Sequence, residues 1–176
     1  MDDPRYPIGP FAFDGLRTPE LRRDRIARIA AAPARLRAAV TGLTDAQLDT
    51  PYRDGGWTLR QVAHHVPDSH LNAYTRFRLT LTEPQPTIKP YLEARWAELP
   101  DARGAPVEIS LALLEALHLR WVLLLRSLES VDWELTYVHP EHGREWSLDE
   151  ALAMYAWHGE HHTAHITRLR DREGWR

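Results

Sequence analysis

Helix-start signals recur along this chain of 176 residues and limit its possible folds more than any other feature. Residues 58–61 (TLRQ) and 147–150 (SLDE) are capping boxes, in which a hydroxyl group and an acid or amide three residues later satisfy free N–H groups at a helix start. Residues 44–47 (TDAQ) repeat this pattern, and residues 18–20 (TPE) place a threonine cap before proline. Apolar side chains at helical spacing follow, and a leucine-rich run adds a further helix. We therefore expect long helices over residues 18–40, 58–82, 107–130 and 147–170.

The connections between these helices carry few strand signals. Short helices are expected at residues 44–50 and 91–98, and only residues 135–139 (LTYVH) alternate weakly in the manner of a strand. Residues 1–17 contain prolines and glycines that favour an extended arm packed onto the body of the protein. The sequence thus predicts one all-α domain over residues 1–176, built as a four-helix bundle with long structured connections.

Composition excludes several classes of function. The net charge of −3 gives no reason to expect nucleic acid or a membrane surface as partner. There are no cysteines, which removes disulfides, cysteine-ligated zinc and a cysteine nucleophile. The N-terminus lacks the apolar run of a signal peptide, and no stretch approaches the roughly 20 apolar residues of a membrane span. We expect a cytoplasmic protein.

Four of the ten histidines lie in the segment WHGEHHTAHI at residues 157–166. On a helix that turns about 100° per residue, His162 lies in the middle of the apolar face and His158 lies one turn before it. Two histidines at this spacing can reach one metal ion. His161 and His165 form a second such pair nearer the rim of the face, where they could support the ligands through hydrogen bonds.

A third ligand is available on the helix predicted at residues 58–82. His65 lies beside its apolar stripe, on a polar strip of the kind that lines a cavity within a bundle. The alternative is that these histidines are hydrogen-bonded residues of the core, but burying three imidazoles without an ion is costly. The other polar side chains within about 60° of His65 include Gln61, Asp68, Asn72 and Arg76.

At these residues the sequence resembles the DinB superfamily of four-helix metal-binding proteins, and within it the YfiT-like branch. The matching stretches are YPIGPF at 6–11, residues 52–83 around AHHVPDSH, PTIKPYLEARWAEL at 86–99 and WHGEHHTAHI at 157–166. The branch is described as metal-dependent hydrolases and resembles bacillithiol-dependent S-transferases. The resemblance implies an up-down-down-up bundle, a homodimer, and His65, His158 and His162 as metal ligands.

Three neutral imidazoles leave a coordination position open on a divalent ion, for which Zn²⁺ is the default and Ni²⁺ or another transition metal an alternative. Our first hypothesis is a transferase that binds a low-molecular-weight, bacillithiol-like thiol as a metal-bound thiolate and moves it onto an electrophilic small molecule. Arg76 would then pair with a carboxylate of the thiol, and Asn72 or Gln61 would bind its sugar.

Two other functions remain open. In a hydrolase the open position would hold water, with Asp68, Glu160 or His161 as general base. In a non-catalytic, metal-stabilised binding module, a fourth protein ligand would close the site. We expect His118 to pack in the core, and we expect His139 and His142 to be solvated in a loop.

Overall fold

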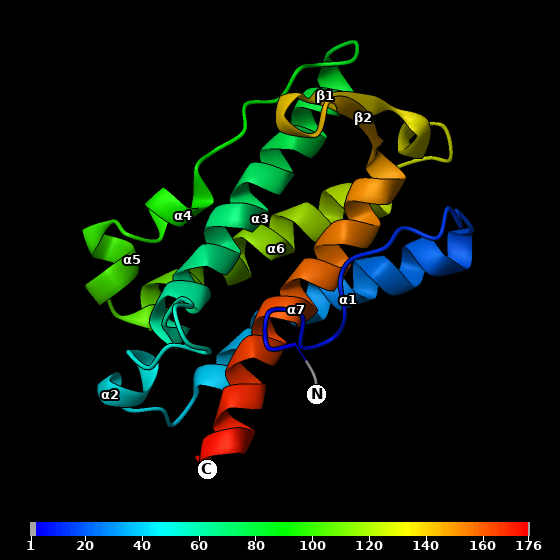
Figure 1. The fold of residues 1–176 in the computed structure, drawn as a ribbon. Helices are drawn as coiled ribbons and strands as arrows, with labels where there is room; N and C mark the ends of the chain where they lie inside the picture. The colour runs from blue at the N-terminus through cyan, green and yellow to red at the C-terminus, as the bar shows by residue number, and fades with distance from the viewer. Residues whose placement is uncertain (1–2, 176) are drawn as a thin grey trace.

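Four long helices pack as a bundle in the computed structural model, which describes residues 3–175 (Figure 1). Their bounds are Pro19–Val40 (α1), Leu59–Thr82 (α3), Val107–Ser127 (α6) and Leu148–Glu173 (α7). The helices α1 and α7 run in one direction along the bundle, and α3 and α6 run in the other (Figure 1). This is the up-down-down-up order that the family resemblance implies.

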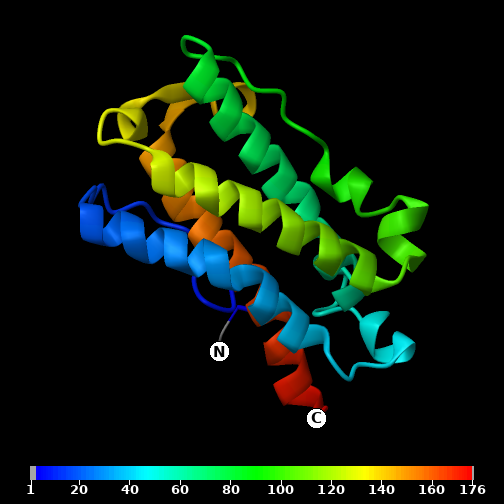
Figure 2. The ribbon, with the colours of Figure 1, turned by 180° about the vertical axis from the view of Figure 1, so that it is seen from behind.

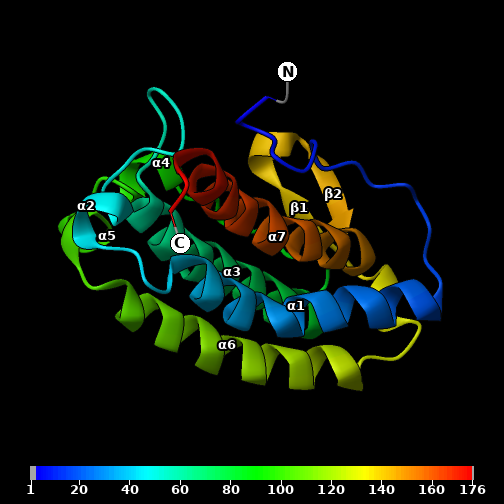
Figure 3. The ribbon, with the colours of Figure 1, turned by 90° about the horizontal axis from the view of Figure 1, so that it is seen from below.

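Of the four long helices, the first two along the chain, α1 and α3, do not pack directly on each other. Helix α1 packs against α6 and α7, and α3 packs against the same two helices. Figure 2 shows α1 beside α6 from behind, and Figure 3 shows the arrangement from below. The helices α1 and α3 therefore occupy diagonal positions, with the centre of the bundle between them.

The predicted helix starts are confirmed. Thr18 accepts a hydrogen bond from the backbone N–H of Leu21, and Ser147 accepts one from that of Glu150. Thr58 forms a complete capping box with Gln61. Helix α6 ends at Ser127, before the predicted residue 130, because the backbone N–H of Glu129 donates to Asp132 Oδ2 (2.8 Å) and the chain turns there.

The connections contain short elements, of which the second strand, the short helix at Pro100–Gly104 and the two 3-10 turns were not predicted. Between α3 and α6, a long connection returns beside α3 (Figure 1). The two strands form an antiparallel hairpin, in which Tyr137 pairs with the buried Trp146 and Gly143 turns the chain with φ of +62°. The short elements are α2 (Asp45–Leu48), α4 (Glu93–Trp96), α5 (Pro100–Gly104), β1 (Thr136–His139), β2 (Arg144–Ser147) and two 3-10 turns, Asp132–Glu134 and Pro140–His142.

A layer of histidines crosses the middle of the bundle and separates two hydrophobic cores. One core surrounds Trp121 and Phe77 near the hairpin, and the other surrounds Leu59 and Leu114 at the opposite end. On each long helix the residues of the first core and those of the second occupy different stretches. His70, His118, His158 and His162 lie between these stretches, and His65 lies at the end of the second core's stretch on α3, next to Val66.

The N-terminal arm lies against α7. Trp157 Nε1 donates a hydrogen bond to the carbonyl oxygen of Gly9 (3.2 Å), and the ring of Phe11 lies 5.9 Å from that of Trp157 between centroids. His165 Nε2 lies 3.3 Å from the carbonyl oxygen of Arg5. These contacts place the arm beside the histidines of α7.

Helix α6 presents an apolar face to the exterior. Ile109, Leu113, Leu119 and Leu123 are all exposed on it. Even so, none of the helices in residues 3–175 combines the length and apolarity that a membrane span requires.

Candidate metal centre

Three imidazoles converge at the centre of the histidine layer. His65 comes from α3, and His158 and His162 come from successive turns of α7. One ring nitrogen of each lies within 4.8 Å of the others. His65 and His162 are buried, and His158 is partly buried. The three residues that the sequence nominated as metal ligands are thus brought together.

Gly159 allows α1 to approach this part of α7. A Cβ atom at residue 159 would lie 3.2 Å from Ala32 Cβ and 3.5 Å from His70 Cε1. The first contact is tighter than usual and involves Ala32 of α1, which packs on α7, whereas the second is an ordinary van der Waals distance. A larger side chain at residue 159, such as the glutamate of the zincin motif, would therefore require α1 to shift.

The cluster has the chemistry that a divalent ion requires. His65 Nε2 and His158 Nε2 lie 3.4 Å apart. Two nitrogens bound to a tetrahedral zinc ion at about 2.1 Å would also be about 3.4 Å apart. Burial lowers the pKa of His65 to about 4 and lowers the pKa values of His158 and His162 well below their usual range, so all three offer neutral lone pairs. The His162 Nδ1 atom is buried and has no hydrogen-bond partner among residues 3–175.

A chain of hydrogen bonds fixes the orientation of His158. Its Nδ1 lies 3.1 Å from His70 Nε2, and His70 Nδ1 lies 2.8 Å from His118 Nε2. The chain ends where His118 Nδ1 donates to the carbonyl oxygen of Ile29 (2.7 Å).

Only one set of histidine tautomers satisfies this chain of hydrogen bonds. The Ile29 carbonyl can only accept, so His118 carries its proton on Nδ1 and accepts at Nε2 when neutral. By the same reasoning His70 donates from Nδ1 and accepts at Nε2, and His158 donates from Nδ1. His158 Nε2 is then left with its lone pair directed at the cluster. Burial lowers the pKa of His118 to about 4 and that of His70 well below its usual range, which keeps both rings neutral.

The sequence analysis did not select His70, although a signal was available. His70 lies about 140° from His65 on the helical wheel, which places it within about 40° of the centre of the apolar stripe of α3. His118 is buried as expected, but it is also the last ring of the hydrogen-bonded chain.

These neutral histidines predict that the metal-free protein loses stability in mild acid. Unfolded histidine has a pKa near 6.5, so as the pH falls below this value the unfolded chain takes up protons that folded His65 and His118 do not. Between pH 7.5 and 5.5 we expect each of these two rings to lower the free energy of unfolding by about 1.4 kcal/mol. The total fall should exceed about 3 kcal/mol, because His70, His158 and His162 are held neutral as well. Urea unfolding followed by circular dichroism measures this.

The variant His118→Leu supplies the control for that measurement. With one neutral histidine removed, the fall in its free energy of unfolding over the same range should be about 1.4 kcal/mol smaller than in the wild type. A free energy of unfolding that is flat from pH 7.5 to 5.5 in the wild type would mean that the buried rings accept protons in the folded state.

Two cavities meet at the cluster. The first, which we call the cluster cavity, has a volume of about 430 Å³ and is lined by His65 and His162. The second, the arginine cavity, has a volume of about 460 Å³ and is lined by Arg76. His158 and Glu93 line both. A small molecule in either cavity would therefore reach the edge of the cluster.

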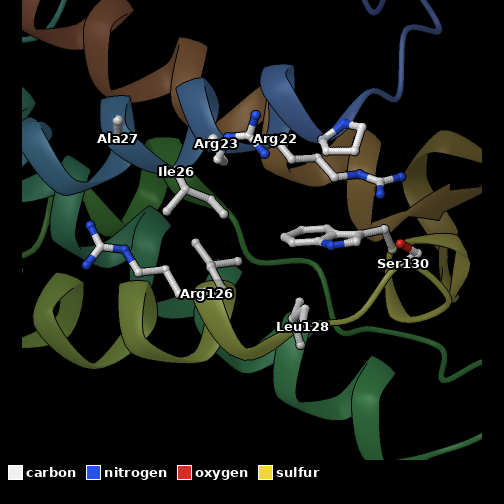
Figure 4. Close-up of a pocket in the computed structure, with 10 residues that line it drawn as sticks. Arg22, Arg23, Ile26, Ala27, Arg126, Leu128 and Ser130 are labelled. Carbon is white, nitrogen blue, oxygen red and sulfur yellow. The ribbon is translucent and has the colours of Figure 1, made fainter.

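A third cavity lies elsewhere and carries different side chains. It has a volume of about 510 Å³ and lies between α1 and α6, lined by arginine and apolar side chains (Figure 4). Arg22 in its wall is committed to Asp149 (2.6 Å). Within the described residues no histidine or acid lines this cavity, in contrast to the cluster and arginine cavities.

The predicted general bases differ in their positions. His161 lines the cluster cavity, and its Nδ1 has no hydrogen-bond partner in the described part of the chain. Asp68 is half-buried, and burial raises its pKa to about 6, but it is not among the residues that line either cavity. Glu160 is held in ion pairs with Arg28 and Arg35 on α1, each at 2.6 Å.

Of the three predicted thiol contacts, only Arg76 lines one of the two cavities. The Gln61 amide donates to the carbonyl oxygen of Ala97 (2.8 Å), and its oxygen accepts from the backbone of Thr58 (2.9 Å). Asn72 donates to the carbonyl oxygen of Asp68 (2.9 Å). Both amides are thus occupied by local structure.

Sequence reasoning did not find Glu93. It lies in the short helix α4, where wheel arguments have little power, and the fold of the long connection brings it to the junction of the two cavities. Burial and the neighbouring Glu141 raise the pKa of its carboxyl group. His139 is also misjudged, because it is buried and lines the arginine cavity, whereas His142 is exposed as expected.

Comparison with known proteins places this site in a family. The family model described as DinB superfamily matches residues 28–166. The chain belongs to the DinB superfamily. It is 56% identical over 175 residues to a protein of Bacillus mycoides (strain KBAB4) named a putative metal-dependent hydrolase, and the match covers 99% of this chain and 100% of that protein. A protein of the same name from Bacillus cereus (strain 03BB102) is 57% identical over the same lengths.

Solved structures agree with this DinB assignment. The structure of YfiT from Bacillus subtilis, described as a probable metal-dependent hydrolase with an unusual four-helix bundle topology, matches with a TM-score of 0.96 and 47% identity over 98% of this chain and 99% of YfiT. The four-helix bundle protein TT2238 shares the fold, with a TM-score of 0.55 and 23% identity over 85% of this chain and 98% of its own. The predicted resemblance to the YfiT-like branch is thus confirmed.

Proposed function

We propose that this chain is a divalent-metal-dependent hydrolase that acts on a small molecule. The observation that carries the proposal is the cluster of three neutral imidazoles at the junction of two cavities, with Glu93 beside it. The names of the relatives support a metal-dependent enzyme and favour hydrolysis over thiol transfer. Zn²⁺ is the first ion to test and Ni²⁺ the second.

A divalent ion on the three histidines would supply a Lewis acid with an open coordination position. Within residues 3–175, the group that contains His65, His158 and His162 has no fourth side chain. This argues against the binding-module alternative, in which a further protein ligand would close the site.

The side chains around the cluster would perform the remaining steps. Glu93 would accept the proton of the attacking water, because it lines both cavities and its raised pKa makes it a stronger base than an ordinary carboxylate. Trp57, whose ring lies 4.7 Å from that of His65 between centroids, would shield the cluster from bulk water. His161 is a weaker candidate for the base, since burial lowers its pKa to about 4.

Thiol transfer remains the second candidate, and the paired cavities are the observation that favours it. A transferase needs room for two substrates, and the cluster and arginine cavities meet at His158 and Glu93. The thiol proton would pass to Glu93 while the sulfur forms its bond to an electrophilic carbon and the leaving group departs with its electron pair. Of the predicted thiol contacts, Arg76 alone fits this arrangement.

The variant Glu93→Gln tests the proposed function. Metal-loaded protein is assayed against a panel of esters and amides, and separately for consumption of low-molecular-weight thiols with electrophiles. Loss of a general base should lower kcat by about 100-fold or more while the metal content stays unchanged. Glu98→Gln, which removes an exposed acid near the same short helix, is the matched control.

The outcome separates the candidates. Metal-dependent ester or amide cleavage that Glu93→Gln impairs supports the hydrolase. Thiol consumption without hydrolysis replaces it with the transferase, and metal binding without either activity leaves the binding module.

We also propose a homodimer. The exposed apolar side chains of α6 would be its interface, since several large exposed apolar side chains on one helix often mark an interaction site. Sedimentation of the wild type against Leu119→Glu, Leu123→Glu tests the assignment of the face.

A further inference from the structure

Arg76 is a buried arginine without an acidic partner. Its side chain is 8% exposed, and no carboxylate within residues 3–175 lies within ion-pair distance of it. The other buried arginines are paired: Arg60 with Asp45 (2.7 Å) and Asp49 (2.6 Å), and Arg25 with Asp14 (3.5 Å) and with a second aspartate. An unpaired buried charge is costly, so Arg76 needs another source of negative charge.

The guanidinium of Arg76 has donors to spare. Within the described chain its side chain makes one hydrogen bond, from Nη1 to Tyr155 Oη (3.2 Å). Its Nε is buried without a protein partner. The edge formed by Nε and Nη2 is therefore free to donate two parallel hydrogen bonds, which is the geometry that a carboxylate or phosphate accepts.

Other polar atoms in the same cavity also lack partners. Tyr91 Oη and His139 Nδ1 are buried without a hydrogen bond to any described residue, and both residues line the arginine cavity with Arg76. The acids of this cavity, Glu93 and Glu141, are both more exposed than Arg76, although Glu93 is partly covered and its carboxylate interacts with the Arg76 charge. The buried part of the cavity is thus positive and offers hydrogen-bond donors, while the acids lie where solvent reaches.

We infer that the arginine cavity is a subsite for an oxyanion, the carboxylate or phosphate group of a substrate whose reacting group lies at the histidine cluster. Tyr155 sets the separation between the oxyanion subsite and the histidine cluster. It is bonded to Arg76, and its ring lies 5.8 Å from that of His158 between centroids. The anionic and reacting groups would be about one tyrosine side chain apart. The reference to a reacting group rests on the proposed function, whereas the oxyanion subsite itself does not.

The test is anion binding to the metal-free protein. Acetate and inorganic phosphate are titrated separately at pH 7.5 and constant ionic strength, and the Nε–H signal of Arg76 is followed by NMR. We expect a saturable shift with a Kd in the millimolar range, as suits so small a ligand. The probe that binds more tightly identifies the substituent.

Variants at two matched positions make the result specific. Arg76→Gln should abolish the binding, and Arg76→Lys should weaken it at least about tenfold, because lysine cannot present the two parallel donors. Arg60→Gln removes a buried arginine from the same helix and should leave the binding unchanged.

The inference is overturned if neither anion produces a saturable shift of the Arg76 signal, or if Arg76→Gln binds them as the wild type does. Should Arg76→Gln fail to fold, the wild-type signal and Arg76→Lys still decide. Since the titration needs neither metal nor turnover, anion binding with no hydrolysis would refute the proposed function alone. Hydrolysis without anion binding would refute the subsite alone.

Discussion

Alanine at both His158 and His162 should lower the affinity for Zn²⁺ by more than about 1,000-fold. The free energy of Zn²⁺ binding to a structural site with four ligands is about 10–16 kcal/mol, so each ligand contributes about 3 kcal/mol. That contribution is more than a 100-fold change in Kd. The two residues supply two of the three nitrogens in the cluster. Titration against a chelator of known affinity measures the change, and the single variant His162→Ala should lose about 100-fold.

His64→Ala is the matched control for this loss. His64 is also buried, and its ring nitrogens contact Ser110 Oγ (2.7 Å) and the carbonyl oxygen of Ala105 (3.1 Å) rather than the cluster. Its removal should cost stability but leave the metal affinity within about twofold of the wild type, because the site is untouched. Equal metal content in the wild type and the double variant would eliminate the site.

The four helices and the histidine trio could be predicted because both depend on local geometry. Caps such as Thr58 and Ser147 act within one turn of the residues they serve, and the spacing of His158 and His162 alone places them on one face. The choice of His65 needed only its position beside the apolar stripe. None of these inferences requires knowledge of which helices are neighbours.

The features that were missed depend on the packing of distant segments. Glu93 reaches the cluster only because the long connection folds back beside α3. Gln61 and Asn72 lie on the predicted polar strip, but nearby backbone oxygens occupy their amides, and this competition is invisible on a helical wheel. The bond between His70 and His118 joins two helices whose adjacency no local pattern specifies.

That bond leads to the second large effect that we expect. His118→Leu removes the acceptor for His70 Nδ1–H and so releases the tautomer of His158. Outer partners of metal-bound histidines typically contribute 10- to 100-fold in affinity, so we expect the Kd for Zn²⁺ to rise by about tenfold or more. In the metal-free protein, the ¹⁵N shifts of His158 should change from a single Nδ1–H tautomer to a mixture.

Two variants distinguish this positioning role from simple destabilisation. His118→Gln offers an amide oxygen that can accept from His70, so it should retain most of the affinity and the Nδ1–H tautomer of His158. His64→Leu removes a buried imidazole between the same two helices, and both readouts should stay as in the wild type. If His118→Leu leaves the tautomer and the Kd unchanged, or if His64→Leu changes them equally, the hydrogen-bonded chain is only part of the core. If His118→Gln retains the Kd for Zn²⁺ and the tautomer of His158 while His118→Leu loses them, the hydrogen-bonded chain is part of the metal centre. It then runs from α7 through α3 and α6 to a carbonyl oxygen of α1, so that all four helices of the bundle fix the orientation of His158.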